Sequence, residues 1–149
     1  MSDLRQLYQE IIVDHTRSPR NFGELDHMTH HADGYNPLCG DQLKLFLMVD
    51  EDNRITEVRF VGTGCSISTA SASMMTEAIK GKTFAECDAL FENFHHMVTD
   101  ESPHDTQALG KLAVFAGVRD YPARVKCATL AWHTLEAAIH RQSQPVSTE

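Results

Sequence analysis

The residues best suited to chemistry in this chain are two neighbouring metal ligands, Cys39 and Asp41, separated only by Gly40. They lie in the stretch Asn36-Pro37-Leu38-Cys39-Gly40-Asp41. Two further thiols, Cys65 and Cys127, could complete a set with them. Three thiolates and one carboxylate are ligands that suit a tetrahedral metal site, so the rest of the chain is expected to bring these positions together.

The local sequence around the two later cysteines favours the thiolate form. Cys65 follows Gly62-Thr63-Gly64 at an expected strand-to-helix corner, where backbone N–H groups and the helix dipole lower a thiol pKa. Cys127 follows Lys126 directly and lies one helical turn from Arg124. Such a set suits Zn²⁺ or an iron–sulfur cluster. The spacing contains no C-x-x-C pair, so it also allows the alternative that these cysteines are small core residues.

The other candidate ligands are weaker. Cys87 lies among apolar residues of an expected helix and is interpreted as a core residue. Of the nine histidines, His30-His31 and His95-His96 are adjacent pairs, whose side chains diverge rather than converge on one ion, so surface positions are expected. The Gly62-Thr63-Gly64 turn has neither the GxGxxG pattern nor the Lys-Ser/Thr pair of a phosphate-binding loop, which argues against nucleotide binding.

Composition limits the class of protein. With 149 residues, 42% hydrophobic and 23% charged, the chain fits one globular domain, expected over residues 1–141 with a flexible polar tail at 142–149. A net charge of -8 argues against nucleic-acid binding. Between Lys82 and Lys111 there is no Lys or Arg, which indicates a solvated acidic surface or a docking patch for a basic partner.

The sequence shows neither a secretory signal nor an apolar run long enough to cross a bilayer. We therefore expect a cytoplasmic protein with no membrane partner. In a reducing compartment the four cysteines are better suited to metal binding or thiol chemistry than to disulfides.

Hydrophobic periodicity predicts the elements that position these ligands. Alternating or continuous apolar residues predict strands at 43–49 and 55–61, and a short strand is expected within 27–33. Helical spacing and end signals predict helices at 3–17, from Cys65-Ser66 to about Gly81, from Thr83 onward, at 109–118 and from Pro122 onward. The helix from Thr83 is expected to begin with a Thr83–Glu86 capping box, and residues 100–105 are expected to form a loop. Strict alternation at 55–61 puts Ile55 and Val58 on opposite faces. The last helix is expected to bury a stripe made by Ala128, Ala131, Trp132, Leu135, Ala138 and Ile139. The expected fold is α+β, with a small, mostly antiparallel three-stranded sheet and helices packed on one side.

Three segments in order resemble one family, the U-type iron–sulfur assembly proteins, which are IscU, SufU and the N-terminal domain of NifU. The segments are Asn36-Pro37-Leu38-Cys39-Gly40-Asp41, Gly62-Thr63-Gly64-Cys65-Ser66 and Arg124-Val125-Lys126-Cys127. The resemblance is closer to SufU than to IscU. Lys126 stands where the IscU pattern has a histidine, and the interval from Cys65 to Cys127 is longer, with an extra segment expected within residues 99–119.

The resemblance implies a zinc site made by Cys39, Asp41, Cys65 and Cys127. It also implies that Cys39 accepts persulfide sulfur from a PLP-dependent, SufS-like cysteine desulfurase, after a desulfurase histidine displaces it from zinc, and passes it toward downstream iron–sulfur scaffold proteins. Arg124 and Lys126 are expected to stabilise a persulfide anion or to dock the partner. A non-enzymatic [2Fe–2S] assembly scaffold and a structural zinc module remain the alternatives, so whether the chain is an enzyme stays open.

Overall fold

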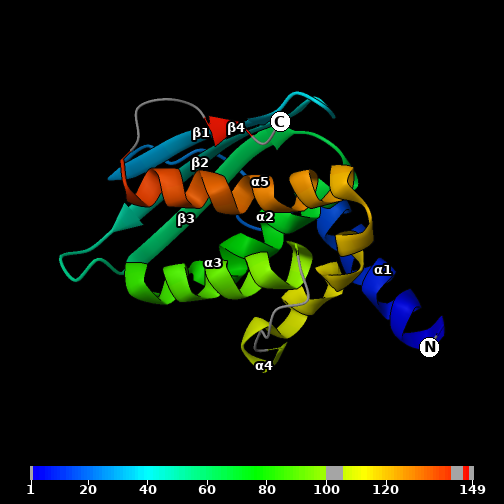
Figure 1. Ribbon diagram of the computed structural model, residues 1–149. Coiled ribbons are helices and arrows are strands. Elements are labelled where there is room, and N and C mark those ends of the chain that lie inside the picture. The colour runs from blue at the N-terminus through cyan, green and yellow to red at the C-terminus, as the bar shows by residue number, and fades with distance from the viewer. Residues whose placement is uncertain (1, 100–105, 142–145, 148–149) are drawn as a thin grey trace.

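The computed structural model describes residues 2–99, 106–141 and 146–147, which form one sheet and a set of helices (Figure 1). In chain order the elements are α1 (Ser2–Arg17), β1 (His30–Asn36), β2 (Asp41–Val49), β3 (Ile55–Thr63), α2 (Ser66–Ile79), α3 (Phe84–Thr99), α4 (Thr106–Leu109), the 3-10 helix η1 (Gly110–Asp120), α5 (Pro122–Ile139) and β4 (Val146–Ser147). The predicted α+β class is confirmed. None of the described helices combines the length and apolarity needed to cross a membrane.

The sheet has one strand more than the sequence predicted. Its order is β3-β2-β1-β4, with antiparallel pairing among the first three strands. The added strand β4 pairs in parallel with β1, at Gly34 and Tyr35. A strand of two residues is too short to show a hydrophobic period in the sequence. It is defined only by its pairing with the edge of β1. Of the tail expected to be flexible, Val146–Ser147 therefore forms a strand, and residues 142–145 and 148–149 lie outside the described part.

A β-bulge corrects the predicted faces of β3. The register runs Met48↔Glu57 and then Val49↔Ile55, so Thr56 is an extra residue without a partner of its own. The sequence placed Ile55 and Val58 on opposite faces by strict alternation. The bulge shifts the phase by one residue, and both side chains are fully buried on the same side.

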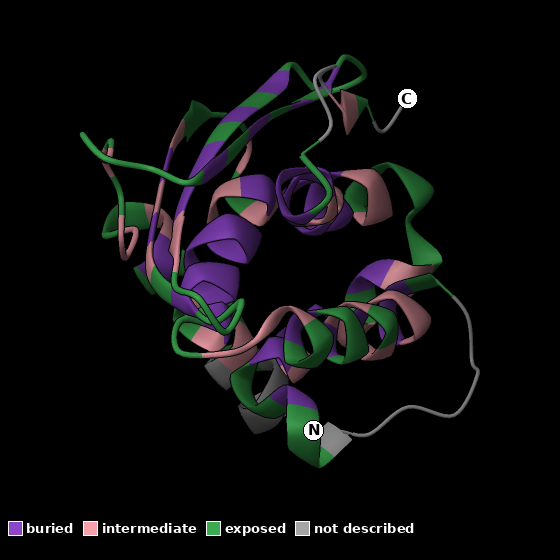
Figure 2. Cartoon of the chain, turned by 90° about the vertical axis from the view of Figure 1, so that its left-hand side faces the viewer, coloured by how far each residue is buried: buried purple, intermediate pink, exposed green. Residues whose placement is uncertain are grey.

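Helices cover a single face of the sheet, as predicted. α2 and α5 lie directly against the strands, and α1, α3 and η1 pack on the far side of these two helices (Figures 1 and 2). β1 alternates buried and exposed residues along its whole length, as a strand with one covered face should. The core centres on Trp132 of α5, whose ring stacks on Phe94 of α3 at 4.6 Å between centroids. The buried stripe predicted for α5 is confirmed at Ala128, Ala131, Trp132, Leu135, Ala138 and Ile139.

Two helix ends agree with their sequence signals. The backbone N–H of Thr83 donates to Glu86 Oε1 at 2.9 Å and the N–H of Glu86 donates to Thr83 Oγ1 at 3.3 Å, which is the predicted capping box of α3. Pro122 is the first residue of α5, also as predicted.

The helix expected at 109–118 is instead the end of α4 followed by η1, because Gly110 has a φ of +55° and interrupts the α-helical path. The loop expected at 100–105 lies outside the described residues.

Candidate metal centre

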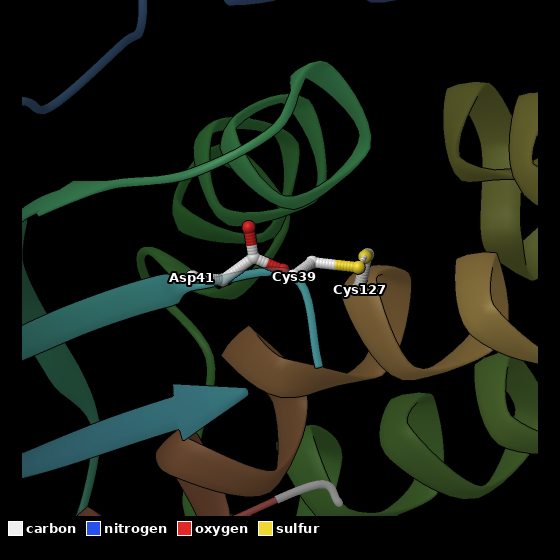
Figure 3. A group of neighbouring side chains, drawn as sticks. All are labelled: Cys39, Asp41 and Cys127. Atoms are coloured by element: carbon white, nitrogen blue, oxygen red, sulfur yellow. Dashed lines mark hydrogen bonds between the residues drawn. The ribbon is translucent and has the colours of Figure 1, made fainter. Parts of the chain in front are cut away.

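Three of the four candidate ligands meet at one end of the sheet. Cys39 lies in the loop between β1 and β2, Asp41 is the first residue of β2, and Cys127 is in the second turn of α5. Their ligand atoms all lie within 4.8 Å of one another. The Cys127 thiol donates to Cys39 Sγ at 3.5 Å (Figure 3). Side chains from a loop, a strand and a helix therefore converge on one point.

The loop that carries Cys39 is the turn of a hairpin closed by Asn36 and Asp41, which are partners in the β1–β2 register. Gly40 completes this turn with a φ of +72°, a conformation that favours glycine. The loop puts Cys39 at an exposed position, whereas Asp41 is 0% exposed and Cys127 only 3% exposed. One thiol of the group is thus open to a partner, while the carboxylate and the other thiol are enclosed.

The Asp41 carboxylate is held through both of its oxygens. Oδ1 accepts the backbone N–H of Cys65 at 2.9 Å, and Oδ2 accepts the Asn36 Nδ2 amide at 3.1 Å. Gly64 allows this approach, because a Cβ there would overlap Asp41 Oδ1. Hydrogen bonds that fix a carboxylate in this way are the usual second layer around a metal ligand.

The same carboxylate lacks a positively charged partner. In residues 2–99, 106–141 and 146–147, no Lys, Arg or His forms an ion pair with Asp41. A fully buried carboxylate beside two thiols is costly unless a cation balances it. The enclosed charge and the sulfur-rich donor set both fit Zn²⁺, and the same ligands suit iron.

Cys65 lies beside this group and not within it. Its Sγ accepts the Ser68 N–H at 3.5 Å and so caps α2, whereas its backbone N–H holds Asp41. Its thiol still interacts with Cys127. Burial, followed by the side chains of Asp41, Cys39 and Cys65, raises the pKa of Cys127 far above its ordinary value, so without a cation this thiol stays protonated. The structure therefore brings together three of the four predicted ligands, and the Cys65 thiol caps α2 instead of joining them.

Both basic side chains predicted to assist the site lie on the first turns of α5, before Cys127. Arg124 is exposed, and its guanidinium lies 4.5 Å from the centroid of the Tyr121 ring. Lys126 is half-buried. Arg124 and Tyr121 also line a groove of about 850 Å³ between α1, α2, η1 and α5, whose walls are mostly apolar. Arg124 and Tyr121 thus form a cation–π pair at the N-terminal end of α5, on the wall of this groove.

Sequence reasoning missed the part played by Asn36. Its side chain is fully buried and contacts two of the candidate ligands, Asp41 and Cys127. The only signal was its place at the head of the Cys39 stretch. Asparagine is common in turns, so that signal alone did not separate a turn residue from one that touches the centre.

The remaining cysteine and several histidines complete the assignment. Cys87 is 0% exposed in the core, and burial, with a smaller effect of Asp88, raises its pKa to about 12, as expected for an inert thiol. The expectation of surface histidines is wrong for His15 and His30, which are 4% and 8% exposed. Both pack against other elements of the domain, and neither belongs to the group around Cys39.

Comparison with known proteins gives matches over nearly the whole chain. The family model described as the NifU-like N terminal domain matches residues 7–128. The iron–sulfur cluster assembly scaffold protein IscU of Streptococcus pyogenes serotype M1 is 41% identical over 143 residues, covering 96% of this chain and 89% of the relative. The zinc-dependent sulfurtransferase SufU of Bacillus subtilis is 40% identical over 141 residues, covering 95% of each chain.

Solved structures agree with these matches. A crystal structure from Fervidobacterium islandicum AW-1, described as an iron–sulfur cluster assembly scaffold protein for the SUF system, aligns with a TM-score of 0.84 and 36% identity. It covers 91% of this chain and 98% of that chain. The relatives named as scaffold and as sulfurtransferase are almost equally similar to this chain, so identity alone does not choose between the two activities.

Proposed function

The chain belongs to the IscU, SufU and NifU N-terminal domain family, and we propose that it acts there as a zinc-dependent sulfur acceptor for iron–sulfur cluster assembly. The observation that carries this proposal is the difference in solvent exposure between the ligands. Asp41 and Cys127 are buried, whereas Cys39 is exposed on a hairpin loop only 3.5 Å from the Cys127 thiol. A purely structural metal site would enclose every ligand.

The proposed partner is a PLP-dependent cysteine desulfurase that carries a persulfide on its own cysteine. Bound zinc would keep its cysteine ligands deprotonated near neutral pH. The Cys39 thiolate attacks the outer sulfur of the partner's persulfide, the partner's S–S bond breaks, and the partner's cysteine leaves as a thiolate. Cys39 then carries the persulfide. Asp41, Cys65 and Cys127 remain to hold the metal while Cys39 is away from it.

Residues on the first turns of α5 and in the Cys39 loop are suited to docking the desulfurase and to stabilising a persulfide anion. Arg124 and Lys126 stand one turn or less before Cys127 on α5, and a persulfide anion on Cys39 would form near this end of the helix. Leu38 and Tyr121 are 62% and 52% exposed, which offers apolar contact beside the reactive thiol. We propose these side chains as the contact surface for the desulfurase.

Metal analysis together with mass spectrometry tests the proposal. The purified chain is expected to contain zinc in an amount equal to the protein, to gain one sulfur atom on Cys39 with a cysteine desulfurase and cysteine, and to raise desulfurase turnover. Cys39→Ser should abolish the gain, whereas Cys87→Ala, which removes the buried thiol, should keep it. Bound iron with visible absorption, without any rise in desulfurase turnover, would contradict the proposal and favour the scaffold function.

A further inference from the structure

Asn36 is the side chain that links two of the buried ligands to each other. It is the last residue of β1 and is 0% exposed. Its Nδ2 amide donates to Asp41 Oδ2 at 3.1 Å and to Cys127 Sγ at 3.5 Å. One amide group thus joins a ligand of the sheet to a ligand of α5, in addition to the direct contacts of Cys127 with Asp41 and Cys39.

The orientation of this amide follows from charge. Turning it by 180° would point its carbonyl oxygen at a carboxylate and a sulfur, which are both acceptors when they bind a metal. Nδ2 must therefore face the ligands, and Oδ1 is left buried with no hydrogen-bond partner among the described residues. An unpaired buried acceptor destabilises the fold. This cost is hard to explain if Asn36 serves packing alone.

Asn36 contacts only the buried ligands of the centre and not the exposed Cys39. Its amide reaches Asp41 and Cys127, and Asp41 in turn is tied to the Cys65 backbone through Oδ1. Cys39 joins this group through the Cys127 thiol, at 3.5 Å between the sulfurs, and lies on the exposed loop that Asn36 and Asp41 close. Departure of Cys39 would thus leave the three other ligands connected.

We propose that Asn36 is a positioning residue that keeps Asp41 and Cys127 in a metal-binding arrangement when Cys39 leaves it. The inference rests on the proposed function, because it assumes a bound metal and a Cys39 that departs. Its physical basis is that an N–H donor offsets part of the negative charge that thiolates and a carboxylate bring together, and that it fixes their direction. The effect should be greatest when only three protein ligands remain.

A set of variants separates this role from packing. Loss of an outer hydrogen bond to metal ligands typically weakens binding 10- to 100-fold, so Asn36→Ala should release zinc to a chelator roughly tenfold faster than the wild type. Cys39→Ser should keep zinc on the three remaining ligands, and Asn36→Ala combined with Cys39→Ser should lose it. The Co²⁺ spectrum of Asn36→Ala should also shift, because the thiolate environment changes. Gln42→Ala, which removes an exposed amide directly after Asp41, is the control and should release zinc at the wild-type rate.

Thermal unfolding gives the second readout. Bound metal raises the melting temperature by an amount that follows its affinity. Asn36→Ala should reduce this zinc-dependent rise, whereas a packing role would lower the metal-free and zinc-loaded proteins equally. Asn36→Asp has nearly the same shape without the amide donor, and it guards against an alanine variant that fails to fold. It should release zinc at least as fast as Asn36→Ala, whereas a space-filling role predicts wild-type retention.

The outcomes distinguish the inference from the function on which it rests. Wild-type zinc release and an unchanged zinc-dependent rise in both Asn36→Ala and Asn36→Asp would overturn the role of Asn36 and leave the sulfur-acceptor function standing. Loss of zinc from Cys39→Ser alone would instead count against a departing Cys39. In that case the release rate of Asn36→Ala, with Cys39 present, still decides whether Asn36 positions the ligands.

Discussion

The Asp41 carboxylate depends on its neighbours more than any thiol of the centre does. Its Oδ1 accepts a backbone N–H, its Oδ2 accepts a side-chain amide, and its position requires that Gly64 has no side chain. The thiols have softer constraints, since Cys39 lies on an exposed loop and Cys65 Sγ accepts the Ser68 N–H at 3.5 Å within the cap of α2. The direction of the Asp41 carboxylate is therefore set by the Asn36 amide, by the backbone of Cys65 and by the absence of a side chain at Gly64.

Substitution of Gly64 tests this dependence. A Cβ at Gly64 would overlap Asp41 Oδ1, so Gly64→Ala should turn the carboxylate and weaken zinc binding by tenfold or more. The measurement is zinc retained after dialysis against a chelator, with circular dichroism to confirm the fold. Gly117→Ala is the matched control, because a Cβ there meets nothing within 4 Å. Equal zinc retention in the wild type and both variants would show that Asp41 does not need this space.

At this scale the sequence predicted which residues meet but not how they are held. Residue type and three ordered segments pointed to Cys39, Asp41, Cys65 and Cys127, and the structure brings three of them within 4.8 Å. The contact of the Asn36 amide with Cys127 could not be predicted, because it joins positions 91 residues apart in the chain. The cap made by Cys65 is local, to Ser68, but cysteine is not among the preferred N-cap residues and so gave no signal. A buried polar contact leaves no periodic signal in a sequence.

Among the elements, α3 shows how strongly a local signal can fix a helix end. The Thr83–Glu86 capping box satisfies two N–H groups at the start of α3, directly after the turn at Gly81. Both members are neighbours in sequence, so the pattern alone predicted the contact. The β-bulge at Thr56 and the strand β4 depend instead on pairing with other strands, and the sequence missed both.

The cap of α3 should have a measurable effect on stability. Removal of an N-cap hydroxyl costs about 1 kcal/mol, so Thr83→Ala should lower the free energy of unfolding by roughly that amount. Thr99→Ala is the control at the other end of the same helix, where the Thr99 hydroxyl donates only to His95 O in an exposed position. Such a backbone contact contributes little, so this variant should stay within about 0.5 kcal/mol of the wild type. Urea unfolding measures both, and equal effects would contradict the cap.

Across the whole molecule, histidines connect the layers of the domain. His15 of α1 contacts Ser73 Oγ of α2 at 2.7 Å, and His30 of β1 accepts Arg141 Nε at 3.2 Å beyond the end of α5. His133 of α5 packs edge-on against the His95 ring of α3, with 5.9 Å between centroids. The sequence predicted a surface position for His30, because the tertiary packing that buries a polar residue leaves no pattern in the sequence.

These positions alter the proton affinity of the rings. Burial lowers the pKa of His15, His30 and His133, and the neighbouring Arg20, Arg141 and His95, respectively, lower it further. The pKa of one carboxyl is shifted upward instead, because burial and the adjacent Asp88 raise the pKa of Glu136 to about 7. The folded chain thus resists protonation at three rings and retains a proton at one acid.

Stability of the metal-free protein should therefore fall as pH decreases from 7.5 to 5.5. Unfolded histidines take up protons near their ordinary pKa of 6.5, whereas the three folded rings stay neutral to lower pH, so acid favours unfolding. Glu136 has the opposite effect on the free energy of unfolding, because its raised pKa makes it stabilise the folded state more as pH falls from 7 toward 4.5. The three histidines outnumber this single carboxyl, so the net effect of acid is expected to be destabilising. Removing the metal first keeps protonation of zinc ligands out of the measurement.

Urea unfolding across this pH range, for the wild type and two variants, checks the histidine effect. His15→Gln should flatten the fall in stability between pH 7.5 and 5.5, whatever its stability at pH 7.5, because it removes one of the three rings with a lowered pKa. His31→Gln changes an exposed histidine on β1 and should follow the wild-type curve. Parallel curves for the wild type and His15→Gln would mean that the ring between α1 and α2 does not contribute, and that the acid response arises elsewhere in the fold.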